Sequence, residues 1–99
     1  MKDFLASEII KDELEKMGMD LTRYRWALYQ DIEFNTWFDL IREGPSRDYV
    51  VMTPLKDVYK MKPNDFRRMV FDSVKRMWAK IADDNFPEWD IAEVLEWKK

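Results

Sequence analysis

Two absences limit the chemistry that this chain can perform. Its 99 residues include neither histidine nor cysteine, the types that supply most proton transfer, nucleophilic attack and transition-metal binding in proteins. Serine and threonine hydroxyls are present, but no imidazole can activate them, and Ser73 and Lys75 are one residue too close for the S-x-x-K signature. The two glycines, Gly18 and Gly44, form neither a phosphate loop nor a dinucleotide-binding turn. We therefore predict a protein that is not an enzyme and that binds no cofactor.

Acidic residues crowd near the C-terminus and suggest a cation site. If Asp83 were the first ligand of a calcium-binding loop, Glu88 would fall at the glycine position and Val94 at the bidentate position, so the pattern fails. An acidic loop that leads into the start of a helix accounts for the same residues. We expect no metal site.

The composition is typical of one soluble domain spanning residues 1–99. Hydrophobic residues make up 46% of the chain and charged residues 37%, a balance found in globular rather than disordered proteins. The longest apolar runs, such as 26–29 and 49–52, have four residues, which is too short for a signal peptide or a membrane span. We expect a cytoplasmic protein with no membrane segment.

Apolar periodicity predicts a mainly α-helical fold, a compact bundle of four to five helices. Residues 2–17 carry apolar side chains at helical spacing and stop at Gly18, a common helix terminator. Thr53 and Pro54 suit the start of a short helix, and Asn64 suits the cap of the longest one. The expected helices cover 2–17, 21–42, 54–61, 64–81 and a final segment that follows a loop at 83–87.

The segment 20–43 is compatible with two secondary structures. Aromatic and β-branched residues are frequent there, which favours strands. A helix is favoured by the Gly-Pro stop at 44–45 and by the lack of a tight-turn dipeptide within the segment. We predict a helix over 21–42 with a break near Asn35; the alternative is an α+β fold with a small hairpin formed by 36–41 and 48–53.

The helix predicted over 64–81 has an unusually wide apolar stripe. Phe71 and Trp78 extend its core positions sideways, next to Arg67, so that the apolar arc covers roughly 200° where a surface helix needs about 100°. Such a helix is either central in the fold or presents an apolar edge to a partner. Trp and Arg often dominate binding energy, so we predict that Arg67, Phe71 and Trp78 contact a partner. The expected core positions are Phe66, Met69, Val70, Val74, Met77 and Ile81.

The opposite face of the same helix is basic, with Arg68, Lys75 and Arg76 surrounding Asp72. A short helix, a turn and a basic helix follow the order of a helix-turn-helix. The net charge of −3 opposes phosphate binding by the rest of the molecule. Nucleic-acid binding by Arg68, Lys75 and Arg76 is therefore the second hypothesis, and a solvated basic face is its alternative.

Trp89 and Glu93 also have two interpretations. On a helix that already includes Glu88, Trp89 lies beside Glu93 on the polar side, a position typical of a binding anchor. With Asp90 as the helix cap instead, Glu93 completes a capping box and Trp89 pairs with Val94 in a hydrophobic staple. We keep Trp89 and Glu93 as candidate partner-binding residues.

These features together indicate a non-catalytic protein-binding module. A short chain rich in tryptophan and methionine suits a small adaptor or inhibitor. The specific form that we expect is a phage or mobile-element protein that blocks a host enzyme or a defence complex. The alternatives are a nucleic-acid-associated regulator and a structural subunit of a homo-oligomer.

Overall fold

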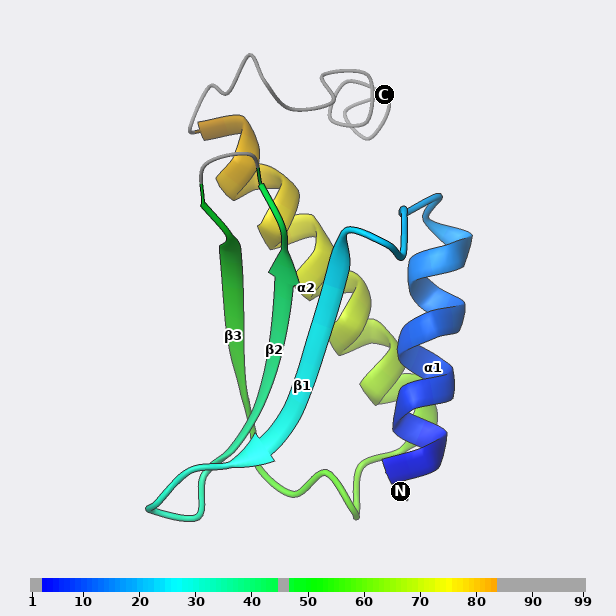
Figure 1. Cartoon of the computed structure of the whole chain (residues 1–99). Helices are drawn as coiled ribbons and strands as arrows, with labels where there is room; N and C mark the ends of the chain where they lie inside the picture. Colours follow the sequence, from blue (N-terminus) through cyan, green and yellow to red (C-terminus); the bar gives the residue numbers. More distant parts are fainter. Residues whose placement is uncertain (1–2, 45–46, 84–99) are drawn as a thin grey trace.

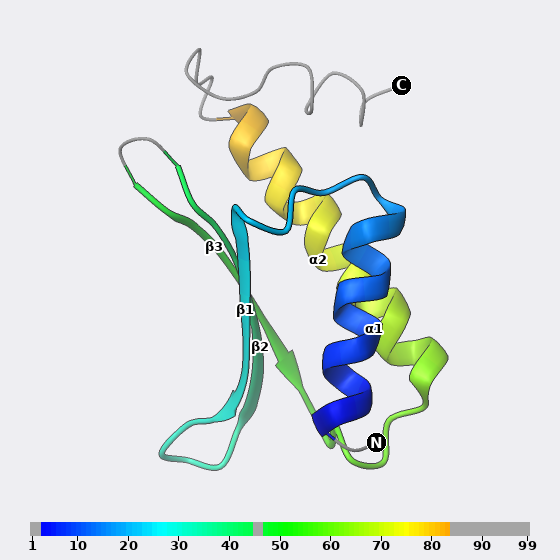
Figure 2. The same ribbon diagram turned by 45° about the vertical axis from the view of Figure 1, so that its right-hand side comes forward.

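A three-stranded antiparallel sheet and two helices form the described part of the chain, residues 3–44 and 47–83 of the computed structural model. In chain order the elements are α1 (Asp3–Lys16), β1 (Tyr24–Gln30), β2 (Thr36–Arg42), β3 (Tyr49–Leu55) and α2 (Pro63–Asp83). The strands lie in the order β1-β2-β3, and both helices cover the same side of the sheet (Figures 1 and 2). The predictions for residues 84–99 lie outside the described residues.

The prediction of a bundle of four to five helices is wrong, because the chain folds as α+β. The segment 21–42 is not a helix: it forms β1 and β2, which pair along their whole length. The turn between them needs no glycine. Phe34 adopts a left-handed φ of 65°, and the Asp31 side chain accepts hydrogen bonds from the backbone of the turn, as aspartates do in Asx turns.

The α+β alternative, with a hairpin at 36–41 and 48–53, places β2 and β3 nearly correctly, since these strands pair antiparallel. The predicted short helix at 54–61 is wrong, because Pro54 lies within β3 and a turn occupies 58–60. Proline is tolerated in β3 because this is an edge strand, where one row of N–H groups has no neighbouring strand to bond.

The core lies between the sheet and the helices. Alternate residues of β2 point into it, and all of them are buried: Thr36, Phe38, Leu40 and Arg42. Phe38 packs edge-on against Phe66 of α2, with the ring centroids 6.3 Å apart. The guanidinium of the buried Arg42 lies 5.1 Å from the centre of the Tyr24 ring and donates a hydrogen bond to the carbonyl of Glu43. Cation–π contact and hydrogen bonding thus accompany its burial.

The first and the longest predicted helices are confirmed as α1 and α2. The chain leaves α1 at Gly18, whose φ is 72°, a conformation that glycine adopts without strain. Pro63 begins α2 one position before the expected cap Asn64, as suits proline in a first helical turn. The predicted core stripe is buried throughout: Phe66, Met69, Val70, Val74, Met77 and Ile81.

Candidate interaction surface

The structure does not gather Arg67, Phe71 and Trp78 into one exposed edge. Trp78 is only 4% exposed, and its indole N–H donates to the Tyr24 hydroxyl over 3.1 Å. Phe71 is 41% exposed, whereas Arg67 turns toward α1. Of these three side chains, Phe71 alone offers a large apolar area to a partner. Their joint role in binding stays a prediction.

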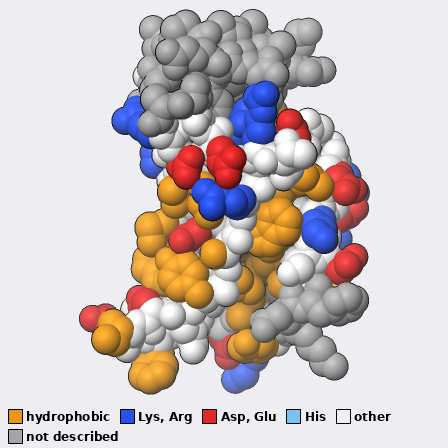
Figure 3. All heavy atoms as spheres, in the orientation of Figure 1, with side chains coloured by type: hydrophobic (Ala, Val, Ile, Leu, Met, Phe, Trp, Pro, Cys, Tyr) orange, Lys and Arg blue, Asp and Glu red, His pale blue; other side chains and the backbone are white. Residues whose placement is uncertain are grey.

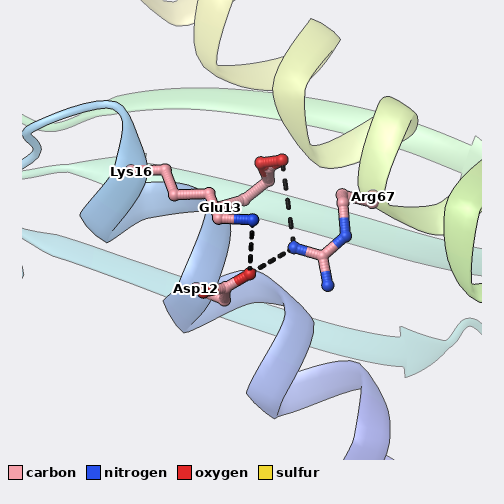
Figure 4. A network of polar contacts seen from close by, with 4 residues as sticks. All are labelled: Asp12, Glu13, Lys16 and Arg67. Carbon is pink, nitrogen blue, oxygen red and sulfur yellow. Dashed lines mark hydrogen bonds and ion pairs between the residues drawn. The ribbon is translucent and has the colours of Figure 1, made fainter.

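Arg67 connects the two helices. Its Nη1 donates to Oδ2 of Asp12 and lies 4.0 Å from Oε1 of Glu13 (Figure 4). Lys16 pairs with the same Asp12 carboxylate at 3.1 Å. Hydrogen bonds from Lys16 and then from Arg67 lower the pKa of Asp12. This network holds α1 against α2, so Arg67 has a structural task already.

Two of the three basic residues proposed for nucleic-acid binding make contacts within the chain. Arg76 donates to the Thr53 hydroxyl on β3, and its Nη2 lies 3.4 Å from the Ser73 hydroxyl. The ammonium of Lys75 lies 5.4 Å from the centre of the Phe71 ring. These contacts tie the side chains to neighbouring surface groups.

Arg68 and Arg76 line an open groove of about 590 Å³ between β3 and α2. Asp65 and Asp72 line the same groove. Two carboxylates beside two guanidiniums leave little net charge to attract a phosphate backbone. The geometry of this groove therefore gives the nucleic-acid hypothesis no added support.

The side of the sheet that faces away from both helices is largely apolar. We call it the outer face; its side chains are Arg25, Ala27 and Tyr29 from β1, Trp37, Asp39 and Ile41 from β2, and Val50, Met52 and Pro54 from β3. Met52 is 50% exposed, and Figure 3 shows hydrophobic side chains gathered over the strands. At one end of this face, Arg25 lies 3.1 Å from carboxylate oxygens of both Glu43 and Asp48.

A second apolar feature is the turn between β1 and β2, residues 31–35, which we call the tip. It projects beyond the sheet (Figures 1 and 2), and it leaves Ile32 95% and Phe34 79% exposed. The tip is nevertheless well ordered by hydrogen bonds. Oδ1 of Asp31 accepts from the backbone N–H groups of Glu33 and Asn35, each over 2.9 Å.

Asp31 also connects the tip to the outer face. Its Oδ2 accepts a hydrogen bond from the indole N–H of Trp37 over 2.9 Å, and this bond is the main cause of the lowered pKa of Asp31. Tyr29 lies opposite Trp37 in the sheet, and partial burial together with a hydrogen bond to Asp39 raises its pKa. The tip and the outer face thus form one continuous surface, which we call the docking surface.

Sequence reasoning did not identify Ile32 or Phe34. The available signal was Asp31 followed four residues later by Asn35, two residue types that favour turns, between two aromatic runs. This signal is weak because it contains no glycine or proline.

Comparison with protein-family models, with curated proteins and with solved structures finds no match. Within residues 3–44 and 47–83, no three acidic side chains gather in a way that would hold a metal ion. Neither described helix is long and apolar enough to cross a membrane. Trp89 and Glu93 lie outside the described residues.

Proposed function

We propose that this chain is a non-catalytic protein-binding module that contacts its partner through the docking surface. The observation that carries the proposal is the near-complete exposure of Ile32 and Phe34 on a hydrogen-bonded turn. Large apolar side chains in contiguous exposed patches mark interaction sites in soluble proteins. Here they adjoin an apolar sheet face that no described helix covers.

The conformation of the tip supports binding rather than chance exposure. Phe34 keeps a positive φ of 65°, which is costly for a bulky residue and persists only where surrounding contacts enforce it. Asp31 supplies those contacts. A rigid turn loses little conformational entropy on association, so its side chains are suited to fill a pocket on a partner.

The charge of the tip indicates which kind of surface on a partner would be complementary to it. Residues 31–35 include the carboxylates of Asp31 and Glu33 and no basic group. A complementary surface would offer an apolar pocket for Ile32 and Phe34 with lysine or arginine at its rim. An anionic lipid surface fits poorly, because it would repel the same carboxylates.

Three described carboxylates are held in the ionised form by hydrogen bonds. Hydrogen bonds lower the pKa values of Asp12, Asp20 and Asp31, so these groups stay ionised at neutral pH. A general acid needs the opposite shift, toward neutral pH. The narrower hypothesis of a phage or mobile-element inhibitor rests on size and composition and stays a prediction.

A capture experiment with matched variants tests the proposal. The tagged full chain is compared with Ile32→Glu/Phe34→Glu and with Phe71→Glu, which places a carboxylate on an exposed aromatic of α2 instead. Each is incubated with lysate of the organism that encodes it, with and without nuclease, and retained proteins are quantified by mass spectrometry. We expect a partner that wild type and Phe71→Glu retain equally and that the tip variant loses at least tenfold.

Two outcomes would contradict this assignment. Loss of the partner with Phe71→Glu but not with the tip variant would place the site on the edge of α2. Loss on nuclease treatment would favour the nucleic-acid hypothesis for Arg68, Lys75 and Arg76. Circular dichroism and melting temperature, which should be unchanged, show that each variant is folded.

A further inference from the structure

The two edges of the sheet are built differently, and the β3 edge is obstructed. In an antiparallel strand, alternate residues direct both backbone groups to the same side. On β3 the outward residues are Val50, Met52 and Pro54, because the carbonyl of Val50 accepts a hydrogen bond from Lys80 of α2 over 2.9 Å and so faces away from β2. Pro54 has no N–H. Of these three outward residues of β3, Met52 therefore offers both its N–H and its carbonyl to another strand.

Within residues 3–44 and 47–83, no strand pairs with the outward edge of β1. Hydrogen bonds from Glu43 N to Arg23 O and from Asp31 N to Asn35 O, each 2.9 Å, continue the β1–β2 ladder at both ends. They show that odd-numbered residues of β1 bond to β2, so that even-numbered residues direct their backbone groups outward. No hydrogen bond from the described residues reaches the outward groups of Trp26, Leu28 and Gln30.

Natural sheets protect exposed edges with proline, lysine or a covering element. The β3 edge has both Pro54 and Lys80, whereas the sequence of β1, Tyr24–Gln30, includes neither residue type. The same edge is also apolar. Trp26 and Leu28 are half-buried and pack against the core of the domain. An open row of backbone groups thus runs beside incompletely covered core side chains.

We propose that the β1 edge accepts an extended polypeptide segment of a partner as a fourth strand of the sheet. Backbone hydrogen bonds to Trp26, Leu28 and Gln30 would hold the segment, as in other proteins that bind a peptide by strand addition. Its alternate side chains on the helix side are apolar, because they cover Trp26 and Leu28. This surface is separate from the docking surface, and the proposal does not depend on it.

An isolated strand fits this edge better than a second copy of the chain. Figures 1 and 2 show α1 on the β1 side of the helix layer and α2 behind the other strands. A second copy pairing its own β1 across a two-fold axis would bring its α1 against α1 of the first copy. A segment without a helix above it avoids that overlap.

A defined peptide tests the proposal. The probe is a nine-residue peptide with the sequence of residues 35–43. This sequence includes β2, which pairs with the opposite edge of β1 in the fold and places apolar side chains at alternate positions on the helix side. It is titrated into the isotope-labelled full chain, and amide hydrogen exchange is followed by NMR. We expect exchange at Trp26, Leu28 and Gln30 to slow at least tenfold, while exchange at Met52 of β3 stays unchanged.

Two methylated peptides identify the backbone contacts. In the proposed complex, the peptide residues that correspond to Phe38 and Leu40 place their side chains on the helix side of the sheet. The backbone N–H groups of these two peptide residues then face β1. N-methylation there should weaken binding at least tenfold. N-methylation at the positions of Trp37, Asp39 and Ile41 should leave binding unchanged. Weakening by both methylated peptides would mean that the peptide displaces β2, whose odd-numbered residues bond to β1 and whose even-numbered residues bond to β3. That result, or the reverse dependence, would overturn the proposal.

Matched protein variants complete the test. Gln30→Pro removes one outward N–H of β1 and should weaken peptide binding several-fold, as Pro54 lacks the equivalent group on β3. Met52→Lys alters the docking surface and the β3 edge, and it should leave peptide binding unchanged. Absence of binding at about 1 mM peptide, or equal effects of the two variants, would overturn the proposed edge without bearing on the docking surface.

Discussion

At the scale of single residues, the tip shows how a polar side chain keeps apolar ones exposed. Asp31 accepts hydrogen bonds from Glu33, Asn35 and Trp37. These bonds hold Phe34 in a conformation that a bulky residue rarely adopts. The exposure of Ile32 and Phe34 is therefore imposed by the turn and is not a consequence of local flexibility.

Replacing the strained residue tests this view of the tip. Phe34→Asn should stabilise the protein by up to about 1 kcal/mol, because asparagine tolerates a positive φ far better than phenylalanine. The same change should weaken partner capture, since it removes an exposed aromatic. Urea denaturation measures the first effect. A variant that is less stable than wild type would show that Phe34 makes stabilising contacts at the tip.

Acidification should loosen the tip. The pKa of Asp31 is lowered from its ordinary value of 3.8, so the folded state keeps the carboxylate ionised at a lower pH than the unfolded chain does. The stability that this group supplies is complete well above the unfolded-state pKa of 3.8, from about pH 5, and is lost as the pH falls through the lowered pKa. The indole N–H resonance of Trp37 should shift over that range, and Asp31→Asn should abolish the shift. An indole resonance of Trp37 that is the same in Asp31→Asn as in wild type at neutral pH would contradict the assigned bond.

At the scale of elements, two large aromatic side chains of α2 differ in burial because they lie on different faces of the helix. Trp78 is buried against the core and bonds to Tyr24, whereas Phe71 lies on the solvent side. Trp78→Ala should cost about 3–5 kcal/mol of folding stability. Phe71→Ala should stay within about 0.5 kcal/mol. Equal denaturation midpoints for the two variants would show that the orientation of α2 is different.

The edge of β3 yields a second prediction at this scale. Pro54→Thr restores an outward N–H, and Lys80→Ala frees the carbonyl of Val50. The double variant should self-associate with increasing concentration, because it presents an unprotected strand edge. Sedimentation velocity compares it with Lys75→Ala, which removes a lysine from the same helix away from that carbonyl. Identical sedimentation of the two variants would contradict a protective role for Pro54 and Lys80.

At the scale of the whole molecule, α1 is attached mainly through α2. The two helices contact each other, and α2 contacts β3 and β2. Arg67 spans this interface between Asp12 and Glu13 (Figure 4). Part of the attachment of α1 is therefore electrostatic.

The Arg67 network should make stability depend on salt. Arg67→Met keeps an apolar stem but removes the charge, and it should lower the melting temperature by a few degrees in dilute buffer. The difference from wild type should shrink at 1 M NaCl, since salt screens partly exposed ion pairs. Arg68→Met, on the exposed face of α2, is the control. An Arg67 effect that does not change with salt would show that the side chain acts by packing alone.

The helices were predictable because their pattern is local. Buried residues of α2 recur at spacings of three and four, a period that sequence alone reveals. The strands were less predictable: the α+β alternative located β2 and β3, but β1 was assigned to a helix because β1 and β2 lack clear alternation. On β2, Phe38 and Leu40 face the core while Trp37 and Ile41 lie on the outer face, so apolar residues are adjacent in sequence. Because both faces of β2 carry apolar side chains, its sequence lacks the alternation of apolar and polar residues by which a strand is recognised.

By itself, the sequence determined the two long helices, the core stripe of α2 and the end of α1 at Gly18, since each depends on residues within a few positions of one another. Only the tertiary structure decided the pairing of β1 with β2, the burial of Trp78 and the exposure of Ile32 and Phe34. These features depend on contacts between residues far apart in the chain, such as Trp78 with Tyr24 and Arg67 with Asp12. Whether a sheet edge is accessible to another strand likewise depends on the pairing of all the strands in the sheet.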